Sequence, residues 1–337
     1  MCSYKEIIHY RSIWMAVAAI LIVYCHASLP APGLLFYIKA FSYAGVDIFV
    51  FASGIGCYHS LTRQYDPLSF IKKRFFRIIP VYYIVLIPWL LYQAMRSGLK
   101  FSVAAANLLC VDFLLQTNFE TLWYMNAVWI YYLLAIFMVP TCNKCTLIKK
   151  LVVMILCYVC CLPFIGDIRL MLFSRIPLFF FGILFAEYGS QHQAFTFSEC
   201  IRFLVGSAIG IVMLLFFYYV FPDLMLSYGL YWWPFLLIVP GFCLILSLSA
   251  KKIEKVFPQF IHILNFIGKC TLEIYAIHSF LFVILHNAMS DGLFYGTDKR
   301  WLVFCIIPFI LSGLLVKFHE SVSSKLLIAA HHKQQGE

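Results

Sequence analysis

Residues 201–221 read IRFLVGSAIGIVMLLFFYYVF, a run of 21 residues with a single charged side chain, Arg202. An α-helix rises about 1.5 Å per residue, so this run is long enough to cross the roughly 30 Å hydrocarbon core of a bilayer. The rest of the chain has the same character, because 63% of its 337 residues are hydrophobic and only 12% are charged. A soluble domain typically carries about a quarter charged residues. The composition excludes a disordered chain, a nucleic-acid-binding module and an ordinary cytosolic enzyme.

Similar apolar runs predict an all-α polytopic bundle of about ten membrane-spanning helices. These spans and their connections use up the length, so we expect residues 1–337 to form one membrane domain without a separate soluble domain. The first run lacks a persuasive small-residue cleavage site, and we interpret it as a retained span. The connection 96–121 is compatible with a short interfacial or re-entrant helix at 101–115. The predicted spans are 13–29, 41–61, 78–95, 122–140, 149–165, 171–188, 201–221, 230–249, 262–287 and 301–318.

The distribution of basic residues predicts the orientation of these spans. The formal net charge is +10, and 25 residues are Lys or Arg. Ten spans place both termini on one side, and that side holds 18 of the 25 basic residues. Because Lys and Arg collect in cytoplasmic loops, both termini are expected in the cytoplasm. The other side keeps Lys39, Arg96, Lys100, Arg169, Arg175, Lys299 and Arg300.

Five polar side chains from five predicted spans are expected at a similar depth in the membrane. His26 lies 15 residues beyond Arg11, which corresponds to about 22 Å of helix and places it in the outer half of the first span. Ionisable groups inside a span are costly, so each is a candidate for function. Their alternative role is as hydrogen-bond partners inside the bundle. The five residues are His26, Asp47, Asn126, Arg175 and His278.

Within this layer, His26 and Asp47 are the strongest candidates for catalysis. A carboxylate beside a histidine fixes its tautomer and stabilises the imidazolium, which is the arrangement of a general base. The same groups would also serve a proton-coupled transporter or exporter, in which His and Asp relay protons. No inverted repeat or matching pair of broken spans is evident in the sequence, although such carriers often show one.

A basic cluster follows on the predicted cytoplasmic side. Lys73 and Arg77 are four residues apart and Arg74 and Arg77 are three apart, so on a helix they share a face. Composition alone favours an anchor for anionic lipid headgroups. The alternative is a clamp for a phosphate-bearing ligand, because arginine forks match phosphate oxygens. The thirteen cysteines show no spacing typical of a disulfide framework. Cys142 and Cys145 form a lone CxxC pair without a partner pair, so we expect no metal.

Several stretches, spread over nearly the whole chain, resemble one known family when they are taken in order. The most specific part is GVDxFxxxSG followed by RxxRIxPxY. Together the stretches are similar to the acyltransferase-3 family of integral membrane acyltransferases, which includes many bacterial surface-glycan O-acetyltransferases. The stretches are Cys25-His26-Ala27-Ser28, residues 45–54 (GVDIFVFASG), residues 74–82 (RFFRIIPVY), Leu122-Trp123-Tyr124-Met125, Arg175 with residues 179–182, and residues 267–278 (IGKCTLEIYAIH).

The resemblance implies roles for individual residues. The resemblance maps the catalytic histidine of the family to His26. It also maps an RxxR pair associated with the acyl-CoA donor to Arg74 and Arg77, so it favours the phosphate clamp over the lipid anchor, and we expect the adjoining Lys73 to bind the donor with them. Residues expected to bind substrate or stabilise an oxyanion are Trp123, Asn126, Arg175, Tyr275 and His278.

The chain departs from the family pattern at two positions. Many members carry an arginine eleven residues before the histidine, where this chain has Met15, and some carry a glutamate at the position of Val128. The implied activity is transfer of an acetyl or other short acyl group from cytoplasmic acyl-CoA to a hydroxyl of an extracytoplasmic or lipid-linked glycan. The implied location is a bacterial inner membrane, with lipids and no nucleic acid as partners.

Overall fold

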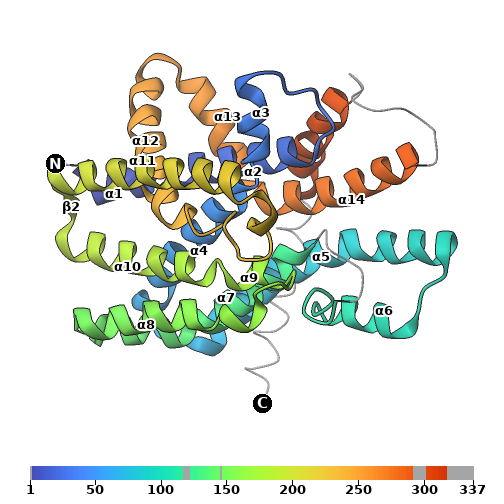
Figure 1. The fold of residues 1–337 in the computed structure, drawn as a ribbon, viewed down its shortest axis with the longest axis horizontal. Coiled ribbons are helices and arrows are strands. Elements are labelled where there is room, and N and C mark those ends of the chain that lie inside the picture. Colours follow the sequence, from blue (N-terminus) through green and yellow to red (C-terminus); the bar gives the residue numbers. More distant parts are fainter. Residues whose placement is uncertain (1, 117–121, 145, 291–300, 317–337) are drawn as a thin grey trace, which may run out of the picture. The chain divides into compact units, whose positions relative to one another are not determined.

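The computed structural model of the chain describes residues 2–116, 122–144, 146–290 and 301–316, and it is helical almost throughout (Figure 1). Within these residues, sheet is limited to two antiparallel two-residue strands, β1 (Cys2–Ser3) and β2 (Ala194–Phe195), with Cys2 opposite Phe195. The all-α prediction is confirmed. The C-terminus and the last two residues of the predicted span 301–318 lie outside the described residues.

Seven segments of the described chain are long and apolar enough to cross a membrane. Five of these segments lie in single helices, α4 (Ala44–Arg63), α5 (Pro67–Ser97), α7 (Trp123–Lys144), α11 (Phe197–Val220) and α12 (Phe235–Val256). The other two combine α8 (Leu147–Val159) with the short 3₁₀ turn η1 (Leu162–Phe164), and α9 (Leu170–Phe173) with α10 (Ile176–His192). The other helices are α1 (Tyr4–His9), α2 (Arg11–His26), α3 (Leu34–Ala40), α6 (Phe101–Leu108), α13 (Pro258–Lys269), α14 (Thr271–Ser290), the short 3₁₀ turn η2 (Pro222–Leu224), and an apolar helix Trp301–Val316.

Every predicted span overlaps a helix, but three of them are interrupted. The predicted span 149–165 divides at Cys160–Cys161, between α8 and η1. The predicted span 262–287 divides into α13 and α14, which are bent at the break. Gly268 lies directly against the backbone of Ser12, where a side chain would not fit, and α13 ends at the next residue. The predicted span 171–188 divides at Ser174–Arg175, between α9 and α10. Hydropathy does not register such breaks, because the residues around them are apolar.

The described chain forms two compact units, each built from separate stretches. The first unit comprises Met1–Ala18, Ala44–Pro67 and Ala127–Gly268. The second comprises Ala19–Tyr43, Leu68–Asn126 and the described residues from Lys269 onward. Four of the boundaries fall inside helices, so α2, α5, α7 and α13 contribute residues to both units, α5 and α13 by a single terminal residue each.

Close packing of α4 against α10 organises the first unit (Figure 1). A Cβ atom at Gly54 would meet the carbonyl of Phe179, and one at Gly182 would meet the carbonyl of Phe51. Small residues of this kind let the backbones of membrane helices approach closely. This contact fixes the register in which the two helices present their polar side chains to each other.

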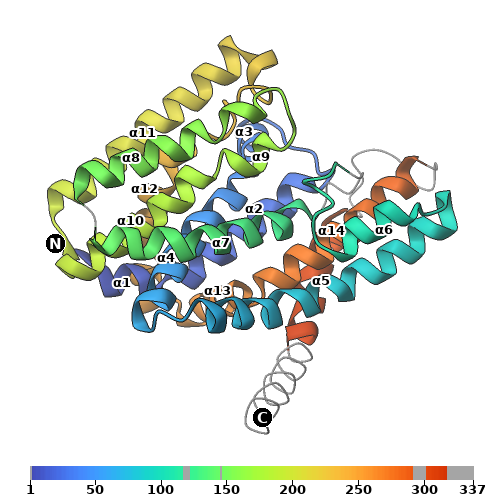
Figure 2. The ribbon, with the colours of Figure 1, turned by 90° about the horizontal axis from the view of Figure 1, so that it is seen from below.

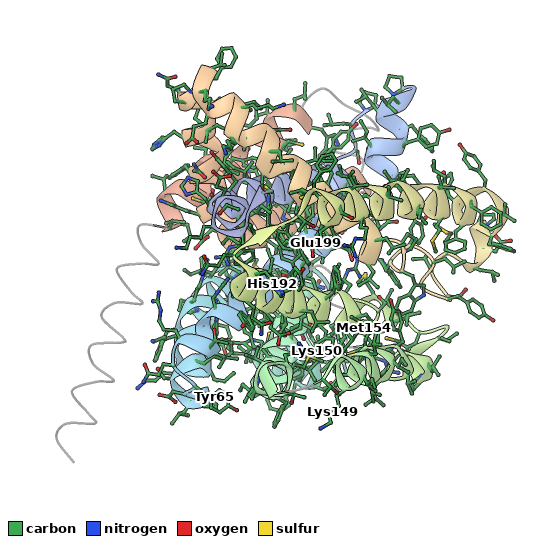
Figure 3. The ribbon with its side chains drawn as sticks, turned by 90° about the vertical axis from the view of Figure 1, so that its left-hand side faces the viewer. Tyr65, Lys149, Lys150, Met154, His192 and Glu199 are labelled. Carbon is green, nitrogen blue, oxygen red and sulfur yellow. The ribbon has the colours of Figure 1, made fainter. Side chains whose placement is uncertain are left out.

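Elsewhere in the first unit, α8 joins α10 through an ion pair. Lys150 donates to Glu187 at 2.6 Å, and the Glu187 side chain is only 4% exposed. Figure 3 shows Lys150 directed toward the helices and Lys149 directed away from them. The outer faces of α8 and α11 expose apolar side chains, including Leu151, Ile155 and Val212, as expected for helices that contact lipid.

In the second unit, α6 folds back along α5 (Figures 1 and 2). The hydroxyl of Tyr82 donates to the carbonyl of Asn107 at 2.7 Å, and that of Tyr83 donates to the carbonyl of Leu108 at 2.8 Å. Both acceptors lie at the end of α6, where helix carbonyls lack partners of their own. The short helix expected within 101–115 is therefore present and anchored to α5.

Candidate functional site

Two histidine rings meet in the second unit. His26 is the last residue of α2, and His278 lies in α14. The Nδ1 atom of His26 is 3.3 Å from the Nε2 atom of His278, and the ring centroids are 5.3 Å apart. His278 is 1% exposed, whereas His26 is exposed. The pair therefore has a buried member and a member that a reactant can reach.

Aromatic side chains hold His278 in place. The rings of Tyr275 and Phe282 meet it edge-on, at centroid distances of 5.3 and 5.7 Å. The hydroxyl of Tyr275 accepts a hydrogen bond of 3.4 Å from the backbone N–H of Tyr124. This N–H lies in the first turn of α7, where backbone donors have no partner within the helix. Tyr275 thus joins the histidine pair to the start of α7, next to Trp123.

A buried carboxylate that the sequence analysis missed lies beside Asn126. Asp112 is fully buried in the connection between α6 and α7, and Asn126 is 2% exposed. Burial raises the pKa of Asp112 to about 6, and the amide of Asn126 acts in the opposite direction. The available signal was a lone acidic residue in the apolar stretch 108–115, but this stretch falls between predicted spans.

Asp47 and Arg175 form a buried ion pair in the first unit. The Nε atom of Arg175 is 3.0 Å from Oδ1 of Asp47, and Nη2 donates to Oδ2 at 3.3 Å. Neither residue is more than 2% exposed. Asp47 lies in the first turn of α4, where a carboxylate is favourable, while Arg175 precedes α10, where a cation is unfavourable unless paired.

Other contacts restrain Arg175 as well. One of its guanidinium nitrogens donates to the carbonyl of Met171, and its Cζ atom lies 5.2 Å from the ring centroid of Trp232. The sequence predicts Asp47 and Arg175 in one layer, but their pairing was not predicted. The expected contact of Asp47 with His26 joins residues of different units and stays a prediction.

The basic cluster lies on α5, near its start. Because Lys73, Arg74 and Arg77 all fall within this helix, the expected i, i+3 and i, i+4 spacings are present. Lys73 and Arg77 are exposed, and the half-buried Arg74 stacks on Phe70 with 5.2 Å between its Cζ and the ring centroid. The cluster can therefore bind an anion with more than one oxygen, such as a phosphate.

Taken together, the second unit provides an accessible imidazole, a buried partner for it, and a separate group of cations on α5. A comparison with protein families gives one match: the model of the acyltransferase-3 family, described as an acyltransferase domain, matches residues 15–319. The match covers every candidate residue described above. No curated protein and no solved structure matches the chain.

Proposed function

We propose that the chain, which belongs to the acyltransferase-3 family of membrane acyltransferases, transfers a short acyl group across a bacterial inner membrane. The donor would be cytoplasmic acyl-CoA, most simply acetyl-CoA. The acceptor would be a hydroxyl of an extracytoplasmic or lipid-linked glycan. The single observation that supports this reaction best is the exposed His26 ring, whose Nδ1 side is held by α2 and by a buried histidine.

In the proposed reaction, His26 is the general base. The acceptor oxygen attacks the thioester carbonyl while Nε2 of His26 takes the hydroxyl proton. The tetrahedral intermediate then collapses, the C–S bond breaks, and the imidazolium returns the proton to the leaving thiolate. The products are the acyl ester and the free thiol of CoA, so protons balance.

Donor binding is assigned to the basic cluster. Acyl-CoA carries several phosphate charges, which are costly to bury in an apolar core, so its phosphates would bind at cations that lie outside that core. Arg74 and Arg77 would bind phosphate oxygens, and the exposed Lys73 would add a third positive charge. The pantetheine arm, which is long and thin, would carry the thioester to His26.

The remaining candidates are divided by the unit in which they lie. Trp123, Asn126 and Tyr275 lie in the same unit as His26, and we assign them to the acceptor or to the oxyanion of the tetrahedral intermediate. Arg175 is already paired with Asp47, so it is a weaker candidate for an oxyanion. Orientation of His26 by Asp47 stays an expectation from the sequence.

Inside-out vesicles test this proposal directly. Labelled acetyl-CoA is supplied on the exposed cytoplasmic face, and label is measured in lumenal glycans and lipid-linked sugars. The expected result is transfer by the wild-type protein and none by His26→Ala. The matched control is His262→Ala, which replaces another histidine, on α13. Equal transfer by His26→Ala would contradict the assignment, and proton-coupled solute flux without acyl transfer would favour a transporter instead.

A further inference from the structure

Hydrogen bonding to carbonyl groups fixes the proton positions in the His26–His278 pair. Nδ1 of His26 lies 3.0 Å from the carbonyl oxygen of Ile22, and Nδ1 of His278 lies 3.1 Å from the carbonyl oxygen of Ile274. A carbonyl oxygen only accepts hydrogen bonds, so each Nδ1 atom must carry a proton. A neutral imidazole has a single N–H, so each Nε2 atom then presents a lone pair.

This assignment also explains the contact between the rings. The lone pair on Nε2 of His278 lies 3.3 Å from Nδ1 of His26, so the N–H of His26 is shared between Ile22 and His278. The opposite assignment, with a proton on Nε2 of His278, would set two nitrogen lone pairs against carbonyl oxygens at 3.0 and 3.1 Å. Such lone-pair contacts repel, so the structure favours the first arrangement.

We propose that His278 is the positioning residue of His26 and takes the part that a carboxylate takes in a serine hydrolase triad. This inference rests on the proposed function. When Nε2 of His26 takes the proton from the glycan hydroxyl, the ring becomes positively charged. Its Nδ1–H then donates a stronger hydrogen bond to His278. His278 therefore acts on the transition state through His26, without touching the substrate.

The surroundings of His278 suit this role better than that of an oxyanion donor. An oxyanion donor needs a proton on the nitrogen that faces the substrate. The Nε2 atom of His278 faces His26 instead, and the ring is buried between Tyr275 and Phe282. The proposal consequently moves His278 from the oxyanion candidates to the orientation of the base.

Two substitutions separate this role from simple packing. His278→Phe keeps a flat ring but removes the nitrogen that accepts the hydrogen bond from His26. His278→Gln places an amide oxygen, which can accept that bond, near the position of Nε2. The matched control is His286→Phe, two turns along α14, because the Nδ1 atom of His286 contacts the carbonyl of Phe282 in the same i−4 manner. Each variant is assayed in inside-out vesicles with their own glycans as acceptor, across a range of labelled acetyl-CoA concentrations.

We expect His278→Phe to lower the maximal rate per molecule about 100-fold, in the range by which a positioned acid or base contributes to catalysis. The KM for acetyl-CoA should stay unchanged, His278→Gln should recover at least a tenth of the wild-type rate, and His286→Phe should stay within twofold of wild type. A wild-type rate from His278→Phe would overturn the proposal, and so would equal loss in the Phe and Gln variants.

Nitrogen NMR of protein labelled with ¹⁵N-histidine provides a readout that does not depend on transfer. The signals of His26 and His278 are assigned from spectra of His26→Gln and His278→Gln. The proposal expects protonated Nδ1 and unprotonated Nε2 in both rings, and a proton on Nε2 of either ring would overturn it. Absence of transfer by the wild-type protein would instead overturn the proposed function, so the two failures are distinguishable.

Discussion

The buried pair of Asp47 and Arg175 gives the sharpest prediction about stability. Its closest atoms are 3.0 Å apart and neither side chain is exposed by more than 2%. With an effective dielectric constant of about 20, the attraction of two unit charges at this distance is about 5 kcal/mol. Removal of one partner leaves a buried charge without compensation, which typically costs about 3–5 kcal/mol. We therefore expect Asp47→Asn and Arg175→Met each to destabilise the protein by that amount.

A double-mutant cycle isolates the interaction. Because Asp47→Asn with Arg175→Met removes both charges, the double variant should be more stable than the sum of the single effects by about 3 kcal/mol or more. The free energy of unfolding is measured in mixed micelles by tryptophan fluorescence. The matched control is the exposed pair of Lys251 and Glu6, at 2.8 Å, for which we expect almost no coupling because solvent screens both charges. A coupling that small for Asp47 and Arg175 would refute the reasoning.

Three further predictions concern donor binding, pH and packing. Arg74→Ala with Arg77→Ala should raise the KM for acetyl-CoA at least tenfold, measured in the vesicle assay, because phosphate contacts are lost. Burial raises the pKa of Asp112 to about 6 from 3.8, so the folded state binds more protons, and the free energy of unfolding, measured in mixed micelles, should fall by about 2 kcal/mol as pH rises from 4 to 6. Gly182→Ala should destabilise the protein by about 1–3 kcal/mol, measured by unfolding in mixed micelles, because the new Cβ meets the carbonyl of Phe51.

Each of these predictions has a control. Arg63→Ala replaces an arginine outside the cluster and should leave the donor KM unchanged. Asp112→Asn should remove the stability change between pH 4 and 6, and persistence of that change would assign it to another group. Gly206→Ala adds a methyl group where the nearest atom is 4.0 Å away, so it should be tolerated, and equal destabilisation by both glycine variants would contradict the packing argument.

Hydropathy was sufficient to predict the helices but not their interruptions. Each apolar run corresponds to helical chain because the bilayer leaves few alternatives to a helix. The breaks at Ser174–Arg175 and after Lys269 were not predicted, since the residues around them are apolar and hydropathy does not register them. The basic cluster was easier to place, because i, i+3 spacing on a helix follows from local geometry alone.

The candidate site was predicted residue by residue, but its pairings were not. Depth in the membrane follows from counting residues, which identified Asp47, Arg175, His26 and His278. The direction in which each side chain points around its helix depends on packing, so the pairing of His26 with His278 and of Asp47 with Arg175 came only from the structure. Asp112 was missed because its position lies outside the predicted spans.

The central claim is that His26 is the base in an acyl-CoA-dependent transfer. The most direct test is the initial rate of label transfer from saturating acetyl-CoA by His26→Gln, with donor binding measured on the same vesicles. The account predicts a rate reduced by at least about 100-fold, as expected for loss of a general base, with donor affinity unchanged. A wild-type rate from His26→Gln would contradict the account.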